Sequence, residues 1–164
     1  MQPHAEHKEE AFRIIHRLCD GIRSKPLDQD LAVFLNDEYG AGSESYEALA
    51  RLLKAGVEEG WVGYVEIEGA DYRRGRIAEP SAATAGMSVE TGLLRDVKGQ
   101  YHCHTNGEIN MVMPLEEHAT FCGKGAGWQV FPPKSEHFPT VVGRALILFF
   151  LPGGEIEYRS PPAA

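Results

Sequence analysis

The length, composition and charge of the chain are those of a single acidic globular domain. Its 164 residues are 43% hydrophobic and 24% charged, so the chain can bury a core without disulfides or a structural metal. The formal net charge of −8 argues against nucleic acid and anionic membranes as main partners. Its apolar runs are far shorter than the ~20 residues of a membrane span, and the polar first ten residues do not resemble a secretory signal, so we expect a cytoplasmic protein.

The first third of the chain is patterned as three helices. Apolar residues recur at three- and four-residue steps over residues 12–22 and indicate an amphipathic helix, with Glu9 near its expected start. Asp28 is a suitable N-cap for a second helix. Ser43 is a suitable N-cap for a third helix, which we expect to end at Gly60.

From Trp61 onward the pattern changes to short strands, most of them separated by glycine, proline or asparagine. Many short strands at regular spacing are typical of a β-sandwich or a small barrel. We therefore predict a mainly β protein in one structural domain, with a helical preface at 1–60, a barrel at 61–159 and a frayed tail at 160–164. The expected strands cover residues 63–68, 72–79, 91–97, 101–104, 108–113, 128–131, 145–151 and 155–158.

One strand carries two histidines in a pattern that favours metal binding. His102 and His104 stand at positions i and i+2 and therefore project from the same face. Imidazole and carboxylate are preferred ligands of borderline divalent metals, which makes Glu108 a candidate third ligand. A two-residue turn at 106–107 would place Glu108 on the opposite face, whereas a three-residue turn at 105–107 with a left-handed glycine pairs it with His104. A shared site therefore requires the three-residue turn.

A second segment places another histidine after a proline turn, and the two segments together resemble the cupin superfamily. The first cupin motif, two histidines and a glutamate, matches His102, His104 and Glu108, and the second, which ends in a histidine, matches Pro132 and His137. The resemblance covers residues 61–159 and implies a cupin-type double-sheet β-barrel, or jelly roll. It also implies that a divalent metal, whose identity stays open, binds at His102, His104, Glu108 and His137.

The cupin motifs are not complete in this chain. Leu115 stands where the first motif ends in glycine, and Lys134 stands where the second motif prefers glycine. These glycines shape turns, so the departures affect the expected loop geometry more than the expected ligand set.

Longer phrases of sequence resemble a smaller family within the cupins, the 4-hydroxylaminobenzoate lyases. They lie at residues 72–76, 102–114 and 127–133, with a following histidine at 137, and the helical preface agrees as well. The resemblance implies that the chain converts 4-hydroxylaminobenzoate and water into 3,4-dihydroxybenzoate (protocatechuate) and ammonia during 4-nitrobenzoate breakdown. We expect no nucleotide or flavin cofactor, and a small aromatic carboxylate as the binding partner.

Such a substrate requires a cation for its carboxylate and an apolar surface for its ring. Arginine offers a bidentate match to a carboxylate, and Arg74 and Arg76 share one face of their expected strand while Arg73 lies on the other. All three are candidates, because the net charge of −8 makes a local positive group necessary. The candidates for the ring are Tyr101, Met111 and Trp128, and in the simplest strand register Met111 lies on the histidine face.

The catalytic candidates are Glu108, His104 and His137, and two routes stay open for them. A metal could polarise the hydroxylamine oxygen and lower the pKa of a bound water. Without a metal, a histidinium could donate a proton to the departing oxygen while Glu108 takes a proton from the attacking water.

Two further functions are alternatives to the lyase. The first is another metal-dependent cupin enzyme that acts on an aromatic acid, such as a dioxygenase or an isomerase. The second is a cupin that binds an aromatic acid without turnover. The resemblance to cupins also leads us to expect a homodimer.

Overall fold

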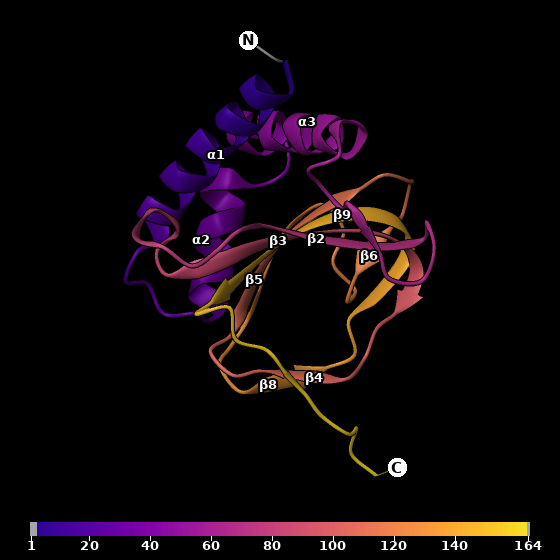
Figure 1. Cartoon of the computed structure of the whole chain (residues 1–164). Coiled ribbons are helices and arrows are strands. Elements are labelled where there is room, and N and C mark those ends of the chain that lie inside the picture. Colours follow the sequence, from indigo (N-terminus) through magenta and orange to yellow (C-terminus); the bar gives the residue numbers. More distant parts are fainter. Residues whose placement is uncertain (1–2, 164) are drawn as a thin grey trace.

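The computed structural model describes residues 3–163, and it consists of three helices laid against one face of a large β-sheet, with a small sheet on the other side (Figure 1). None of the described helices is long and apolar enough to cross a membrane. The helices are α1 (Pro3–Ile22), α2 (Gln29–Tyr39) and α3 (Glu44–Glu59).

The helix ends lie mostly where their capping residues predict them. The Asp28 carboxylate accepts a hydrogen bond from the Leu31 N–H at 3.0 Å and begins α2. The Ser43 hydroxyl does the same for Tyr46 at 3.2 Å, and α3 ends at Gly60, whose φ is +88°. The start of α1 is earlier than predicted, because the apolar stripe marks only the part of the helix that packs on the core.

The large sheet has seven strands, and the strand order along it is β1-β2-β3-β9-β5-β7, with β6 paired to β9. All of these pairs are antiparallel. The strands are β1 (Val65–Glu66), β2 (Tyr72–Ala78), β3 (Met87–Lys98), β5 (Glu108–Pro114), β6 (Thr120–Phe121), β7 (Gly127–Phe131) and β9 (Thr140–Pro152).

The small sheet has three strands in the order β10-β4-β8. These are β4 (His102–His104), β8 (Ser135–His137) and β10 (Glu157–Tyr158). Within the described residues no ladder of hydrogen bonds joins the two sheets, so they face each other as an open jelly roll. The predicted fold class, mainly β with two sheets after three helices, is confirmed. Sequence reasoning missed the strands β6 and β8, which are only two and three residues long.

Alternation along the strands of the large sheet produces two separate cores. Ile109 and Met111 of β5 alternate with Asn110 and Val112, and the first pair packs with the helices. Val112 packs on the opposite face, in a cluster that includes Ile147. The helices therefore cover one face of the large sheet, and its other face looks toward β4 and β8 (Figure 1).

Candidate active site

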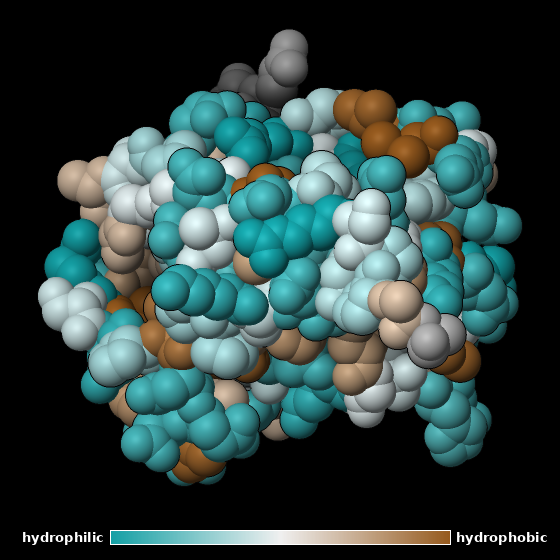
Figure 2. All heavy atoms as spheres, turned by 90° about the horizontal axis from the view of Figure 1, so that it is seen from below, coloured by the Kyte–Doolittle hydropathy of each residue, from teal (hydrophilic) through white to brown (hydrophobic). Residues whose placement is uncertain are grey.

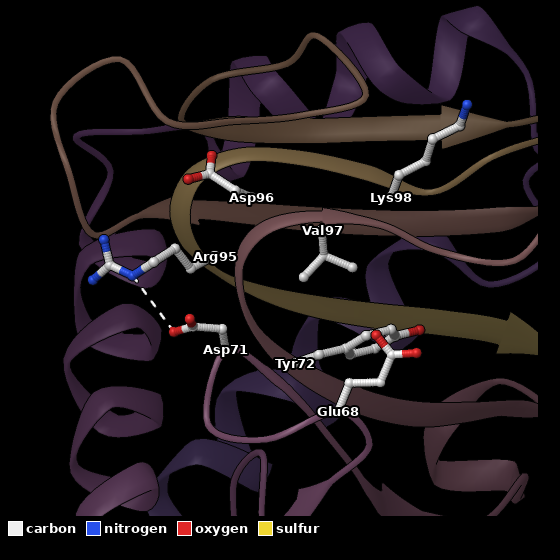
Figure 3. Close-up of a pocket in the computed structure, with 7 residues that line it drawn as sticks. All are labelled: Glu68, Asp71, Tyr72, Arg95, Asp96, Val97 and Lys98. Carbon is white, nitrogen blue, oxygen red and sulfur yellow. Dashed lines mark ion pairs between the residues drawn. The ribbon is translucent and has the colours of Figure 1, made fainter.

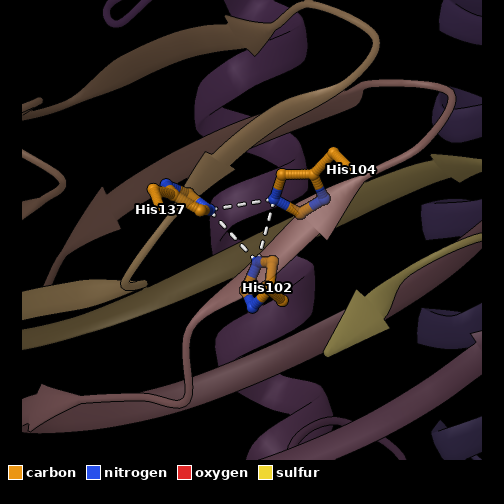
Figure 4. A group of neighbouring side chains, drawn as sticks. All are labelled: His102, His104 and His137. Atoms are coloured by element: carbon orange, nitrogen blue, oxygen red, sulfur yellow. Dashed lines mark hydrogen bonds between the residues drawn. The ribbon is translucent and has the colours of Figure 1, made fainter. Parts of the chain in front are cut away.

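Three histidine side chains converge in the small sheet. β4 and β8 are antiparallel, and their register places His102 directly opposite His137. The three Nε2 atoms form a triangle (Figure 4): they are 3.0 Å apart for His102 and His104, 2.9 Å for His104 and His137, and 3.2 Å for His102 and His137. The strand pairing therefore brings together residues that are 33 to 35 positions apart in sequence.

The carboxylate of Glu108 joins this triangle through the turn after β4. Its Oε2 atom lies 2.8 Å from His104 Nε2, and its side chain is only 5% exposed. The turn is the predicted three-residue one: Gly107 has a φ of +87°, and its N–H donates to the His104 carbonyl at 3.1 Å. The predicted strand pairing of His104 with Glu108 is wrong, however, because the turn carries the chain from the small sheet into the large one.

The donor set fits a divalent metal. Nitrogen ligands about 2.0–2.1 Å from a tetrahedral metal lie roughly 3.3 Å from one another, and the three Nε2 atoms are 2.9 to 3.2 Å apart. The His102 Nδ1 atom is 3.0 Å from the Gln100 carbonyl oxygen, and donation to this oxygen leaves the Nε2 lone pair free to bind. The residues that would hold the ion are His102, His104, Glu108 and His137.

Burial keeps two of the histidines neutral. It lowers the pKa of His137 to about 4, with a smaller contribution from the positive charge that His104 can carry. Burial also lowers the pKa of His102, again with help from His104 and a lesser effect of Arg74. Neutral imidazole is the form that binds a metal, so both residues are ready to act as ligands at neutral pH.

Two neighbours of the histidines were not expected from the sequence. The Cys122 thiol lies 3.6 Å from His137 Nδ1 and 3.9 Å from the Phe138 carbonyl oxygen, and burial raises its pKa so that it stays a thiol. The ring of Phe131 stacks on His104, with ring centroids 5.9 Å apart. No sequence motif identifies either residue. Cys122 reaches the site through the connection between β6 and β7, and Phe131 reaches it as the last residue of β7.

The structure separates the three candidate arginines. The Arg74 guanidinium lies 4.7 Å from the centre of the Phe149 ring, on the face of the sheet that looks toward the histidines. Arg76 is on the same face, and both arginines form an ion pair with Glu90, at 3.7 Å for Arg74 and 3.4 Å for Arg76. Arg76 has a second ion pair, with Glu79 at 2.9 Å. Arg73 points to the opposite face, where its Nε–H donates to the Gly63 carbonyl at 2.7 Å.

Two of the three proposed ring contacts, Met111 and Trp128, lie in the core under the helices and not with the histidines. Because Glu108 opens β5 on the histidine face, alternation places Met111 on the opposite face, in the core under the helices. Trp128 is in the same core, and its indole N–H donates to the Tyr39 carbonyl at 2.8 Å. The Tyr101 ring packs edge-on against Phe138, with centroids 4.9 Å apart. The expectation that Met111 lies on the histidine face is therefore wrong.

A separate hollow lies where β2 begins and β3 ends (Figure 3). Its side chains carry charges of both signs, and Arg95 and Asp71 form an ion pair across it at 3.6 Å. No member of the histidine cluster lines it. The residues around it are Glu68, Asp71, Tyr72, Arg95, Asp96, Val97 and Lys98.

Comparison with known proteins shows which family the chain resembles. Residues 13–158 match the family model of 4-hydroxylaminobenzoate lyase. A 4-hydroxylaminobenzoate lyase of Nocardioides sp. (strain LMS-CY) is 43% identical over 151 residues, which is 87% of this chain and 89% of the relative. One of Pseudomonas putida is 39% identical over 153 residues, 84% and 87% of the two chains.

Solved structures show a similar fold at much lower sequence identity. A chain from the crystal structures of the DMSP lyases RdDddP and RnDddQII superposes with a TM-score of 0.53 at 14% identity, and covers 96% of this chain and 98% of its own. The residues matched by the family model include all four converging side chains, and the two relatives cover most of the chain. This chain therefore belongs to the 4-hydroxylaminobenzoate lyase family.

Proposed function

We propose that the chain converts 4-hydroxylaminobenzoate and water into 3,4-dihydroxybenzoate and ammonia. Membership of the lyase family supports this reaction. The structural observation that best supports the reaction is that three imidazole nitrogens lie within hydrogen-bonding distance of one another, and one buried carboxylate lies within that distance of His104. Cleavage of the N–O bond itself supplies the two-electron oxidation of the ring, so the balance needs no external oxidant.

The four converging side chains are proposed as the reaction centre. A divalent metal bound there would act as a Lewis acid and lower the pKa of a bound water. Glu108 is held 2.8 Å from His104 in a setting almost without solvent, so its carboxylate can take a proton from the water that attacks the ring carbon next to nitrogen. In the metal-free route, His104, which contacts Glu108, would be the histidine that passes a proton to the departing hydroxyl.

The lowered pKa values of His102 and His137 bear on the metal-free route. That route needs a charged histidine beside the leaving oxygen. Burial disfavours the charged form of His102 and His137 at neutral pH, which leaves His104 as the donor for that route. The same neutral rings are good metal ligands. The three converging Nε2 atoms, two of them on neutral rings, are what supports the metal-assisted route.

Arg74 is the proposed partner of the substrate carboxylate. Its Nε atom is buried and has no hydrogen-bond partner among the described residues, and its other contacts are the Phe149 ring and a Glu90 oxygen at 3.7 Å. A partly exposed guanidinium group with a buried, unused Nε–H is well suited to an incoming carboxylate. The proposal selects one of the three candidate arginines expected from the sequence.

The reaction is tested with purified protein and 4-hydroxylaminobenzoate under nitrogen, with and without a chelator. We expect 3,4-dihydroxybenzoate and ammonia in equal amounts without oxygen, and loss of both products when the chelator removes the metal. A requirement for oxygen would instead indicate a dioxygenase. Binding of the compound without ammonia release would indicate a binding protein, and either result would contradict the proposed function.

A further inference from the structure

Two buried amide side chains stand opposite each other in the large sheet. Asn110 on β5 pairs in register with Gln129 on β7. Asn110 is 0% exposed, and neither Oδ1 nor Nδ2 of its amide has a hydrogen-bond partner in the part of the chain that the structure describes. Gln129 Oε1 is buried and unpartnered in the same way. Buried polar groups are nearly always hydrogen-bonded to protein, water or a ligand, so three such atoms at adjacent positions are open to a polar ligand.

The amide pair lies on the face of the sheet that carries the reaction centre. Asn110 is two residues from Glu108 on the same strand, and the residue between them packs under the helices. On the next strand, Asn110 is paired with Phe149, whose ring lies under the Arg74 guanidinium. An aromatic ring placed beside Phe149 would thus have a cation at one end and the amides beside Glu108 at the other.

The hydrogen bonds around Gln129 decide which of its atoms is free. Its Nε2 donates to the Phe121 and Cys122 carbonyl oxygens, both at 3.3 Å, so Oε1 is the atom left to accept. Asn110 adds one acceptor atom, Oδ1, and one donor atom, Nδ2, which carries two N–H groups. The pair therefore offers two acceptor atoms and one donor atom to a ligand.

An aryl hydroxylamine group matches this set. Its N–H and O–H can donate to the two amide oxygens, while its oxygen accepts from Asn110 Nδ2. A nitro group has acceptors only, so both amide oxygens would stay unpaired beside it. A primary amine has donors but no oxygen to accept. Sites built to hydrogen-bond a polar group reject analogues that lack it.

We propose that Asn110 and Gln129 form the subsite that binds the N–OH group of the substrate and rejects the corresponding nitro compound. The inference rests on the proposed lyase function for the identity of the ligand. It adds the residues that would distinguish 4-hydroxylaminobenzoate from 4-nitrobenzoate, which share their ring and carboxylate.

Binding is measured by calorimetry under nitrogen in an E108Q background, where turnover does not interfere. We expect the E108Q protein to bind 4-hydroxylaminobenzoate at least 10-fold more tightly than 4-nitrobenzoate. Asn110→Leu should weaken the hydroxylamine by about 10- to 100-fold, the range expected when buried hydrogen-bonding groups lose their partners, and leave the affinity for the nitro compound within about 3-fold. Gln129→Met should act in the same direction, and Gln29→Met, the same change at an exposed position, should have no effect.

Equal affinity for the two compounds before substitution would overturn the proposal, even if the variants fail to fold. Equal weakening of both compounds by Asn110→Leu would overturn it as well, because a structural role would have that effect. These outcomes differ from failure of the lyase function, which appears as absence of ammonia from the wild-type protein whatever it binds.

Discussion

A single glycine decides whether the Glu108 carboxylate reaches the histidines. Gly107 has a φ of +87°, in the left-handed region that residues with a Cβ disfavour. A Cβ at this position would also lie 2.8 Å from the Phe131 carbonyl oxygen and 2.8 Å from Leu27 Cδ2. The turn from the small sheet to the large one is therefore open to glycine and closed to larger residues.

Gly107→Ala is expected to destabilise the protein beyond the backbone penalty alone. A left-handed alanine costs about 1–2 kcal/mol, and the contact with the Phe131 carbonyl adds to it. Gly123→Ala is the matched control, since Gly123 has a φ of +84° but no described atom within 4 Å of the position of a Cβ. Denaturant unfolding should show a larger loss for Gly107→Ala. Equal losses would mean that the close approach at Gly107 has no energetic weight.

At the scale of elements, the face of the sheet on which a residue of β2 or β5 lies determines whether it can contact the substrate. Alternation on β2 separates Arg74 from Arg73, and alternation on β5 separates Asn110 from Met111. Once one residue of a strand is known to face the histidines, alternation tells which of its other residues do. For β5 that residue is Glu108, which is 2.8 Å from His104.

Neighbouring arginines on β2 should therefore differ in their effect on substrate binding. Arg74→Gln is expected to raise KM for 4-hydroxylaminobenzoate by about 10- to 100-fold, the range of a lost charged hydrogen bond. Arg73→Gln changes the same residue type on the opposite face and should leave KM within about 3-fold. Steady-state kinetics of the two variants checks this, and the reverse order would contradict the assignment of the faces.

Local signals predicted the helix caps and the histidine face, whereas long-range pairing set the rest of the site. Asp28 and Ser43 act within three residues of themselves, so their roles could be predicted from sequence. The partners of β4 are β8 and β10, both more than 30 residues away, and no local pattern identifies them. The expected pairing of β4 with β5 was wrong for this reason. The misplaced Met111 reflects the simplest register assumed for that hairpin.

Trp128 was misassigned for a different physical reason. An apolar strand such as β7 can turn its aromatic residue toward a pocket or toward a covering helix, and its composition is the same in both cases. Here α2 lies against β7, and Asn36 of α2 hydrogen-bonds the Trp128 backbone at both its N–H and its C=O. Which face the helices cover is a property of the tertiary structure, so it decided the role of Trp128.

At the scale of the whole molecule, an acidic protein has to bind an acidic substrate. The net charge is −8, and the space-filling view from below shows a mostly hydrophilic surface with scattered apolar residues (Figure 2). A benzoate anion is repelled by this surface on average, which makes a shielded cation such as Arg74 necessary for binding. The homodimer and the cytoplasmic location stay predictions.

The buried histidines should make the metal-free protein less stable in acid. Folding lowers the pKa of His137 from 6.5 to about 4, so between these values the unfolded chain binds a proton that the folded chain does not. Stability therefore falls as the pH drops from 6.5 toward 4. Urea unfolding of chelator-treated protein at several pH values should show this slope.

A pair of histidine variants tests the origin of this slope. His137→Gln should flatten it, whereas His118→Gln, at a side chain that is 90% exposed, should leave it unchanged. A slope that is the same in both variants would contradict the contribution of His137.

The role of Glu108 in turnover is the most direct test of the proposed centre. Ammonia and 3,4-dihydroxybenzoate are measured under nitrogen for wild type, Glu108→Gln and Glu136→Gln. Glu136 is an exposed glutamate on β8, 3.3 Å from Arg159 and one residue from His137. We predict that Glu136→Gln matches the wild type, and that Glu108→Gln releases both products about 10²- to 10⁴-fold more slowly, the usual contribution of a general base. Near wild-type release by a folded Glu108→Gln protein would contradict the account.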